Sequence, residues 1–125
     1  QPIAAAASYE RAITIRPNSP QIKLLLGRAL IATNDKERLS RAIEVISSAR
    51  TEEPSWAILH RQLGIAYGRA GMISEADMSL AEEAILSGNN VRAVQLAKRT
   101  LARESLAEPL RNRANDIIFR YETKK

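Results

Sequence analysis

The stretch from Leu63 to Gly71, followed by Ala76, constrains the fold of this chain more than any other part of the sequence. Its apolar residues recur at helical spacing, and Gly64 has no side chain, so a second helix can pack closely against it. Tyr67 lies about one turn further along the same helix. Gly71 stands where the helix would end in a left-handed conformation, which glycine adopts most readily. Ala76 is then a small residue on a returning helix, so the stretch predicts two closely packed antiparallel helices.

The rest of the chain has the same helical character. Apolar residues recur at helical spacing almost throughout the 125 residues, and strand-like alternation is missing. No apolar run reaches the roughly 18 residues that a membrane-spanning helix needs. We therefore expect an all-α chain that forms one domain (1–125), a right-handed solenoid of about seven antiparallel helices. The expected helices are residues 2–15, 20–33, 36–51, 55–70, 74–87, 90–103 and 109–122.

Local signals mark where several of these helices begin and end. Ser19 is expected to cap the second helix at its N-terminus. Asn34 can take a left-handed C-cap, and Asp35 can cap the third helix. The tetrads that start at Ser74 (Ser-Glu-Ala-Asp) and Ser105 (Ser-Leu-Ala-Glu) resemble capping boxes, so both serines are predicted N-caps.

The small and aromatic residues recur in a pattern that resembles the tetratricopeptide repeat (TPR), a helix-turn-helix unit of about 34 residues. Small residues let the two helices of such a unit approach, and a proline follows the second helix, as Pro17 and Pro54 do here. The first unit retains only its second helix, from which we expect the chain to be a piece of a longer protein. The residues expected at the packing positions of the repeats are Ala5, Tyr9, Ala12, Gly27, Ala42, Leu63, Gly64, Tyr67, Ala76 and Ala93.

The repeat spacing shortens in the second half of the chain. The distance from Ala76 to Ala93 is about half a repeat. Leu80, Ala81 and Ala84 also fit the first helix of a further unit. We therefore expect helix 74–87 to serve as the second helix of one unit and the first helix of the next, which a stack of neighbouring helices allows.

In TPR stacks the first helix of each unit lines the concave side, so its outward positions form a candidate groove for a partner. These positions mix apolar side chains with arginines, which suit bidentate contact with the carboxylates of an acidic peptide or partner domain. TPR domains that clamp a chaperone's C-terminal carboxylate use a lysine and asparagines. Arg28 and Arg61 occupy two of those positions here and the asparagines are missing, which argues against a chaperone-tail receptor. The expected groove residues are Gln21, Leu24, Arg28, Ile31, Ile58, Arg61, Ile65 and Arg69.

The net charge of +5 arises after residue 90, because basic and acidic residues balance before that point. The basic residues of the C-terminal region end with Lys124 and Lys125. A basic module that binds anions or nucleic acid is therefore one function to consider. Few aromatic residues are available to stack on bases, and a solvated helix face accounts for the charge more simply.

Residues that could carry chemistry are few. The chain has no cysteine, which excludes disulfides, thiolate nucleophiles and cysteine-bound metals. His60 is the only histidine, whereas a zinc site needs several ligands, so we expect a packing or surface role for it. The acidic pairs Glu52-Glu53 and Glu82-Glu83 are adjacent in helices, where neighbouring side chains point in different directions. We therefore expect no catalytic, cofactor-binding or metal-binding residue in this chain.

The C-terminal half resembles a more specific family. The segments 60–69, 80–89, 97–99 and 113–117 carry this resemblance. Together they are similar to the C-terminal TPR domain of bacterial periplasmic zinc metalloproteases, in which a protease domain with an HExxH motif precedes the repeats. The resemblance implies a non-catalytic module that docks partners or substrates for a zinc-dependent protease domain, in the quality control of outer-membrane proteins.

The implied partners are the parent's own protease domain and outer-membrane assembly proteins, and the implied location is the periplasm. The HExxH motif and its zinc would lie upstream of Gln1, because the motif does not occur in this sequence. The alternative is a TPR scaffold from an unrelated parent, such as a secretion or pilus-assembly factor.

Overall fold

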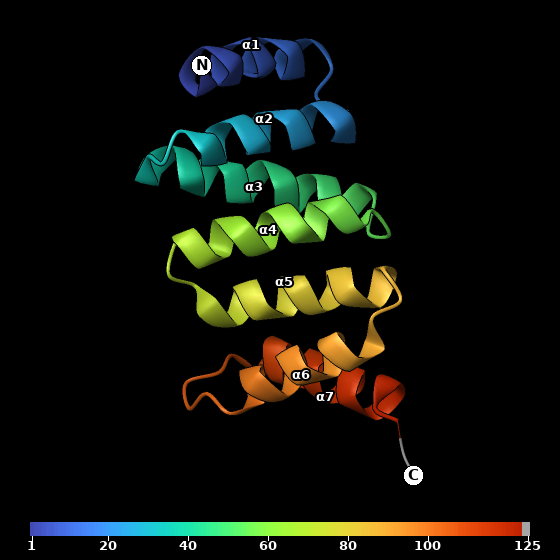
Figure 1. The fold of residues 1–125 in the computed structure, drawn as a ribbon. Coiled ribbons are helices and arrows are strands. Elements are labelled where there is room, and N and C mark those ends of the chain that lie inside the picture. Colours follow the sequence, from blue (N-terminus) through green and yellow to red (C-terminus); the bar gives the residue numbers. More distant parts are fainter. Residues whose placement is uncertain (124–125) are drawn as a thin grey trace.

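The computed structural model describes residues 1–123, and within that range the chain folds into seven α-helices and no strand. The helices α1 to α5 are stacked in chain order, each antiparallel to the one before, and α6 and α7 pack at the C-terminal end of the stack (Figure 1). The predicted all-α architecture is confirmed, and the predicted helix bounds agree to within a turn. The helices are α1 (Pro2–Ile15), α2 (Pro20–Ala32), α3 (Lys36–Glu52), α4 (Ala57–Arg69), α5 (Ile73–Leu86), α6 (Asn90–Leu101) and α7 (Glu108–Tyr121). Across residues 1–123 no helix combines the length and the apolar character needed to cross a bilayer.

Three of the predicted helix ends are confirmed. The hydroxyl of Ser19 accepts a hydrogen bond from the backbone N–H of Ile22, at 3.2 Å. The carboxylate of Asp35 accepts one from the N–H of Arg38, at 3.1 Å. Asn34 adopts the left-handed conformation with a φ of 58°. The side chains of Ser19 and Asp35 satisfy amide groups that the first turn of a helix leaves without partners.

The two predicted capping boxes are wrong. Helix α5 begins one residue earlier, after Met72, and the hydroxyl of Ser74 instead accepts a hydrogen bond from Arg103 at 3.3 Å. Helix α7 begins after Ala107, whose backbone is extended, so Ser105 lies too far upstream to cap it. Neither helix has a side-chain hydrogen bond at its N-cap. The hydroxyl of Ser74 is engaged in a tertiary contact. Ser105 lies in the loop, two residues before Ala107, after which α7 begins.

The apolar core is divided into two clusters, one formed by α1 to α4 and the other by α5 to α7. Leu26, Ile46 and Leu63 are fully buried in the first cluster, and Ile117 is fully buried in the second. The clusters meet where α4 packs on α5. A Cβ atom added at Gly64 would lie 2.7 Å from Cδ2 of Leu80, so the absence of a side chain there permits the close approach of the two helices.

The residues expected at the packing positions lie toward the interior to different degrees. Tyr9 and Tyr67 are partly buried and pack against the first cluster, whereas Ala5 and Ala12 are half-buried. In α1 the fully packed alanine is Ala6. The buried members of the set are Gly27, Ala42, Leu63, Gly64, Ala76 and Ala93.

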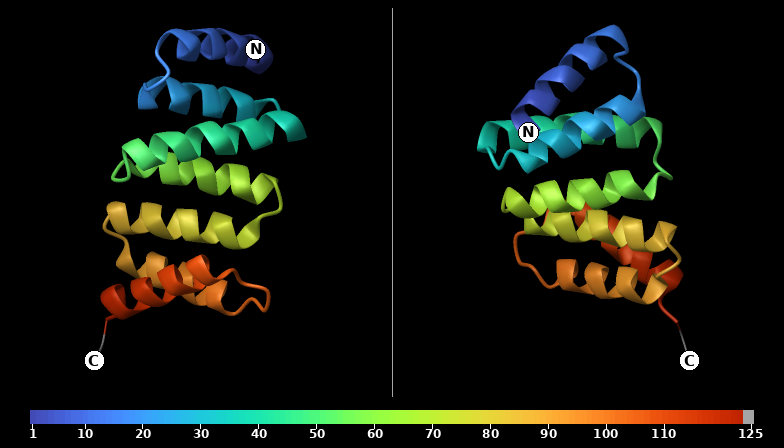
Figure 2. Two further views of the ribbon diagram at one scale, coloured as in Figure 1. Left: turned by 180° about the vertical axis from the view of Figure 1, so that it is seen from behind. Right: turned by 45° about the horizontal axis from the view of Figure 1, so that its top comes forward.

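Helix α5 has the double role that the sequence predicts. It contacts α4, α6 and α7, whereas α4 and α6 do not approach each other. In the first half of the stack the alternate helices that meet are α2 and α4. In the second half they are α5 and α7, and α7 turns back beside α6 toward α5 (Figure 2). Even-numbered helices therefore meet before α5, whereas odd-numbered helices meet from α5 onward.

Candidate partner-binding surface

The outward faces of α2 and α4 lie next to each other, because these alternate helices are in contact. Gln21 and Arg28 are exposed on α2, and Arg61 is exposed on α4 beside the half-buried Ile58. Leu25 is 40% exposed and lies between Gln21 and Arg28 on the same face of α2, although the sequence analysis did not select it. We call this the α2/α4 surface, formed by Gln21, Leu24, Leu25, Arg28, Ile58, Arg61 and Ile65.

Two of the expected groove residues lie elsewhere. Ile31 is only 5% exposed and belongs to the first core cluster, so the structure corrects its assignment to the open surface. Arg69 is exposed, but its guanidinium donates to the carbonyl of Ile31 at 3.1 Å and to the side chain of Asn34 at 3.2 Å. It therefore satisfies the C-terminal end of α2, where carbonyl groups have no partner within the helix. Leu24 and Ile65 are partly buried against the same cluster.

Arg28 and Arg61 make no ion pair or side-chain hydrogen bond within residues 1–123. The sequence explains why, since neither α2 nor α4 contains an aspartate or glutamate. The other cation of α2, Lys23, is buried and pairs with Glu52 of α3 at 2.5 Å. The α2/α4 surface therefore presents two un-neutralised guanidinium groups among leucine and isoleucine side chains.

Hollows lie at both ends of this surface. One, of about 240 Å³, is formed by Gln21, Glu53, Ser55 and Trp56, beside the N-terminal end of α2. The other, of about 420 Å³, is lined by residues that include Ile31, Asn34 and Arg69. An extended or helical segment that crosses the surface would have room for a side chain at either end.

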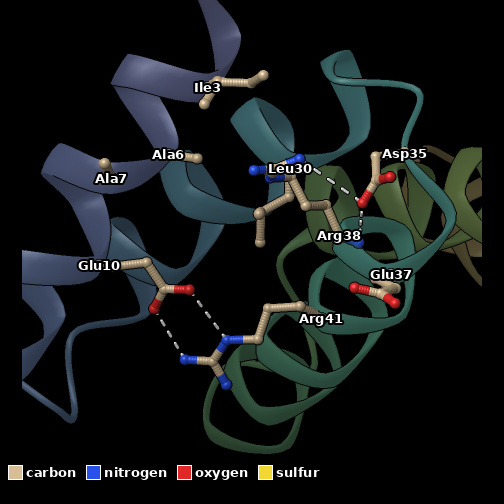
Figure 3. Close-up of a pocket in the computed structure, with 9 residues that line it drawn as sticks. All are labelled: Ile3, Ala6, Ala7, Glu10, Leu30, Asp35, Glu37, Arg38 and Arg41. Atoms are coloured by element: carbon tan, nitrogen blue, oxygen red, sulfur yellow. Dashed lines mark hydrogen bonds and ion pairs between the residues drawn. The ribbon is translucent and has the colours of Figure 1, made fainter.

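A separate hollow of about 440 Å³ separates α1 from α3 (Figure 3). Ile3, Ala6 and Ala7 of α1 lie opposite charged side chains of α3, and Leu30 of α2 lies between the two groups. Arg41 spans the hollow to Glu10, with Nε and Nη2 at 3.2 and 2.9 Å from the two carboxylate oxygens. This hydrogen bonding raises the pKa of Arg41 despite partial burial. Because the charges that cross this hollow neutralise each other, it offers less to a charged partner than the α2/α4 surface.

The basic C-terminal region is largely paired internally. Arg99 and Arg103 both hold Asp77, which is 4% exposed, with N–O distances of 2.6 to 3.0 Å. Burial alone would raise the pKa of Asp77, but the hydrogen bonds from the two arginines outweigh it and lower this pKa. Arg113 pairs with Glu82 through two contacts, and these hydrogen bonds raise the pKa of Arg113.

Other basic groups of the same region are also paired. Arg120 contacts Asp116, and Lys98 contacts Glu122. Lys124 and Lys125 lie outside the described residues. Pairing removes much of the free positive charge on which an anion-binding function would depend.

No group of three or more histidine, cysteine, aspartate or glutamate side chains within residues 1–123 could hold a metal ion. His60 is 6% exposed and is held by its Nε2, which lies 2.8 Å from the carbonyl of Pro54. It therefore has a packing position.

The stacked antiparallel helices with close small-residue contacts define an α-helical repeat protein. Residues 1–63 match the family model described as tetratricopeptide repeat. The chain therefore belongs to the tetratricopeptide repeat family, whose members are protein–protein interaction modules and in general non-catalytic. The matched segment ends within α4, before the helix that breaks the regular repeat spacing. Neither a curated protein nor a solved structure was found to match the chain.

Proposed function

We propose that the chain docks an acidic, partly apolar segment of a partner protein on the α2/α4 surface. The observation that carries this proposal is the pair of unpartnered arginines, Arg28 on α2 and Arg61 on α4. These two helices are in contact, and neither contains an acidic residue. Arginine suits this role because its planar guanidinium can hold a carboxylate with two hydrogen bonds. Leu25 and Ile58 supply apolar area beside the charges.

Charge reversal tests this proposal. The probe is a fluorescent peptide that alternates glutamate and leucine, and its comparison is the same peptide with glutamine in place of glutamate. We expect Arg28→Glu and Arg61→Glu each to weaken binding of the acidic peptide by about tenfold or more, equivalent to about 1.4 kcal/mol. The fold should be retained, because surface substitutions usually change stability by less than about 0.5 kcal/mol.

Arg92→Glu is the matched control, because Arg92 is an exposed arginine without an ion pair on α6, away from this surface. Arg69 is unsuitable as a test residue, since its contacts with α2 make a loss of binding ambiguous. Equal binding of the two peptides, or equal effects of Arg61→Glu and Arg92→Glu, would contradict the proposal.

We further propose that the parent protein is a periplasmic zinc metalloprotease and that this module docks substrates or assembly partners for its protease domain. The support is the resemblance of segments 60–69, 80–89, 97–99 and 113–117 to the C-terminal domain of that family. The test is to read the coding region in frame upstream of Gln1. An HExxH motif behind a signal peptide is the expected result, and a different upstream domain would remove this proposal while leaving the docking role intact.

A further inference from the structure

A further hollow lies on the side of α4 that faces away from the α2/α4 surface. It has a volume of about 310 Å³ and is bounded by α3, α4, α5 and α7. His60 and Tyr67 line it from α4, and because they are seven residues apart they share one face of that helix. Arg61 and Ile65 belong to a different face, so this hollow is separate from the α2/α4 surface.

One wall of the hollow is fixed by an internal ion pair. Nε and Nη2 of Arg113 on α7 lie 2.6 and 2.7 Å from the two carboxylate oxygens of Glu82 on α5. The remaining nitrogen of Arg113, Nη1, donates to Asp116 at 2.7 Å. These three charged groups pair with one another and hold α7 against α5. They form a wall of the hollow and are not free to bind a ligand.

Two further charges face the hollow without partners. Arg50, near the C-terminal end of α3, and Glu75, in the first turn of α5, are half-buried and line it. Neither makes an ion pair or side-chain hydrogen bond within residues 1–123, and they do not pair with each other. The hollow therefore has one cation and one anion that a ligand of complementary charges could engage.

Neutral groups of the hollow are also available. Ser79 is 5% exposed, and neither its hydroxyl nor that of Tyr67 makes a hydrogen bond to another described residue. His60 donates through Nε2 to the carbonyl of Pro54, since a carbonyl can only accept, and its buried Nδ1 has no partner. Buried polar atoms are nearly always paired in native proteins, and Nδ1 of His60 is a buried atom of this hollow that has no partner, so a polar ligand in the hollow could supply one.

We propose that this hollow binds a small zwitterion, of amino-acid to dipeptide size, with a free carboxylate and a free ammonium group. Arg50 holds the carboxylate, Glu75 holds the ammonium group, and the hydroxyls of Tyr67 and Ser79 bind polar atoms between them. Met78 and Leu110 provide apolar contact for a side chain. The volume is near the lower end of ligand pockets, which are about 300 to 1,000 Å³, and this agrees with a ligand of that size.

Calorimetric titration of the whole chain tests the proposal with leucine, alanyl-leucine and alanyl-alanyl-leucine. The same compounds with the amino end acetylated or the carboxyl end amidated are the comparisons. We expect saturable binding of at least one free compound, and about tenfold or greater loss when either end is blocked. The best-bound length reports the spacing of the two charged side chains.

Two variants assign each end of the ligand. Arg50→Gln should abolish the preference for a free carboxylate over the amide, and Glu75→Gln should abolish the preference for a free amine over the acetyl form. Arg92→Gln and Glu104→Gln are controls, because both residues are exposed and without ion pairs outside the hollow. Circular dichroism and the thermal midpoint establish that each variant is folded.

No binding of any free compound at millimolar concentration would overturn the proposal, as would equal binding of free and blocked forms. Unchanged selectivity in folded Arg50→Gln and Glu75→Gln would overturn it too. Because the probes and residues differ from those of the α2/α4 surface, failure here leaves the docking proposal untouched.

Discussion

Gly27, Gly64 and Gly68 lie within helices and differ in how much space surrounds the position of an added Cβ atom. An added Cβ at Gly27 would lie 2.3 Å from Cγ1 of Ile46, which is fully buried, whereas at Gly68 its nearest neighbour is Ala76 at 4.0 Å. Alanine favours a helix over glycine by about 1 kcal/mol, while overpacking costs about 1–3 kcal/mol. We therefore expect Gly68→Ala to stabilise the chain by about 0.5–1 kcal/mol and Gly27→Ala to destabilise it.

Urea unfolding of the variants checks this order. Gly64→Ala should fall between the other two, because its Cβ would meet Leu80, which is only partly buried and can shift. A Gly27→Ala variant as stable as Gly68→Ala would show that α2 and α3 are not as closely packed as described.

Asp77 makes the stability of the chain sensitive to acid. Its pKa in the folded state is lowered below the unfolded value, so the unfolded state binds more protons in acid and stability falls with falling pH. This contribution is fully present above the unfolded pKa of about 3.9 and is lost as the pH falls through the folded pKa. We expect Asp77→Asn to lower the free energy of unfolding at pH 7 by about 1–3 kcal/mol.

The same variant should also flatten the acid limb of a stability–pH curve measured by urea unfolding. Glu104→Gln, at an exposed residue without an ion pair, should leave the curve unchanged. If the stability–pH curves of Asp77→Asn and of the unmodified chain are parallel below about pH 4, the role given to Asp77 is contradicted.

At the scale of the element, the bidentate contact between Glu82 of α5 and Arg113 of α7 joins two helices that are distant in sequence. The side chains are 26% and 38% exposed, so solvent screens the pair only in part. A double-mutant cycle with Glu82→Gln and Arg113→Gln should give a coupling of about 0.5–1.5 kcal/mol. The more exposed pair of Lys98 and Glu122 should give a smaller coupling, and the reverse order would contradict this account.

The sequence predicted the helices well, because periodicity and turn residues are local properties. It predicted the double role of α5 as well, since the shortened repeat spacing is visible in the sequence. It placed the N-caps of α5 and α7 wrongly. Whether Ser74 caps a helix or binds Arg103 depends on the loop after α6, which lies further along the chain. The same limit applies to Ile31 and Arg69, whose positions follow from how α2 and α4 meet.

The hollow beside His60 could not have been predicted from spacing. It joins residues of α3, α4, α5 and α7, and it exists because α7 turns back onto α5. His60, which lines the hollow, is the only histidine of the sequence, and the sequence predicted only a packing or surface role for it. At the scale of the whole molecule, the proposed zwitterion site therefore depends on the contact of α7 with α5, whereas the sequence shows only a shortened repeat spacing there.

The division of the apolar core into two clusters has a consequence for the stability of the whole chain. In a stack where each helix contacts its neighbours, the two ends can open separately. Ile117 is fully buried in the second cluster, so Ile117→Ala should cost about 2–5 kcal/mol and accelerate amide hydrogen exchange mainly in α6 and α7. Leu26→Ala, in the first cluster, should accelerate exchange mainly in α1 to α3. Each variant is the other's control, and equal acceleration in all seven helices in both variants would show that the chain unfolds as one cooperative unit across the contact of α4 with α5.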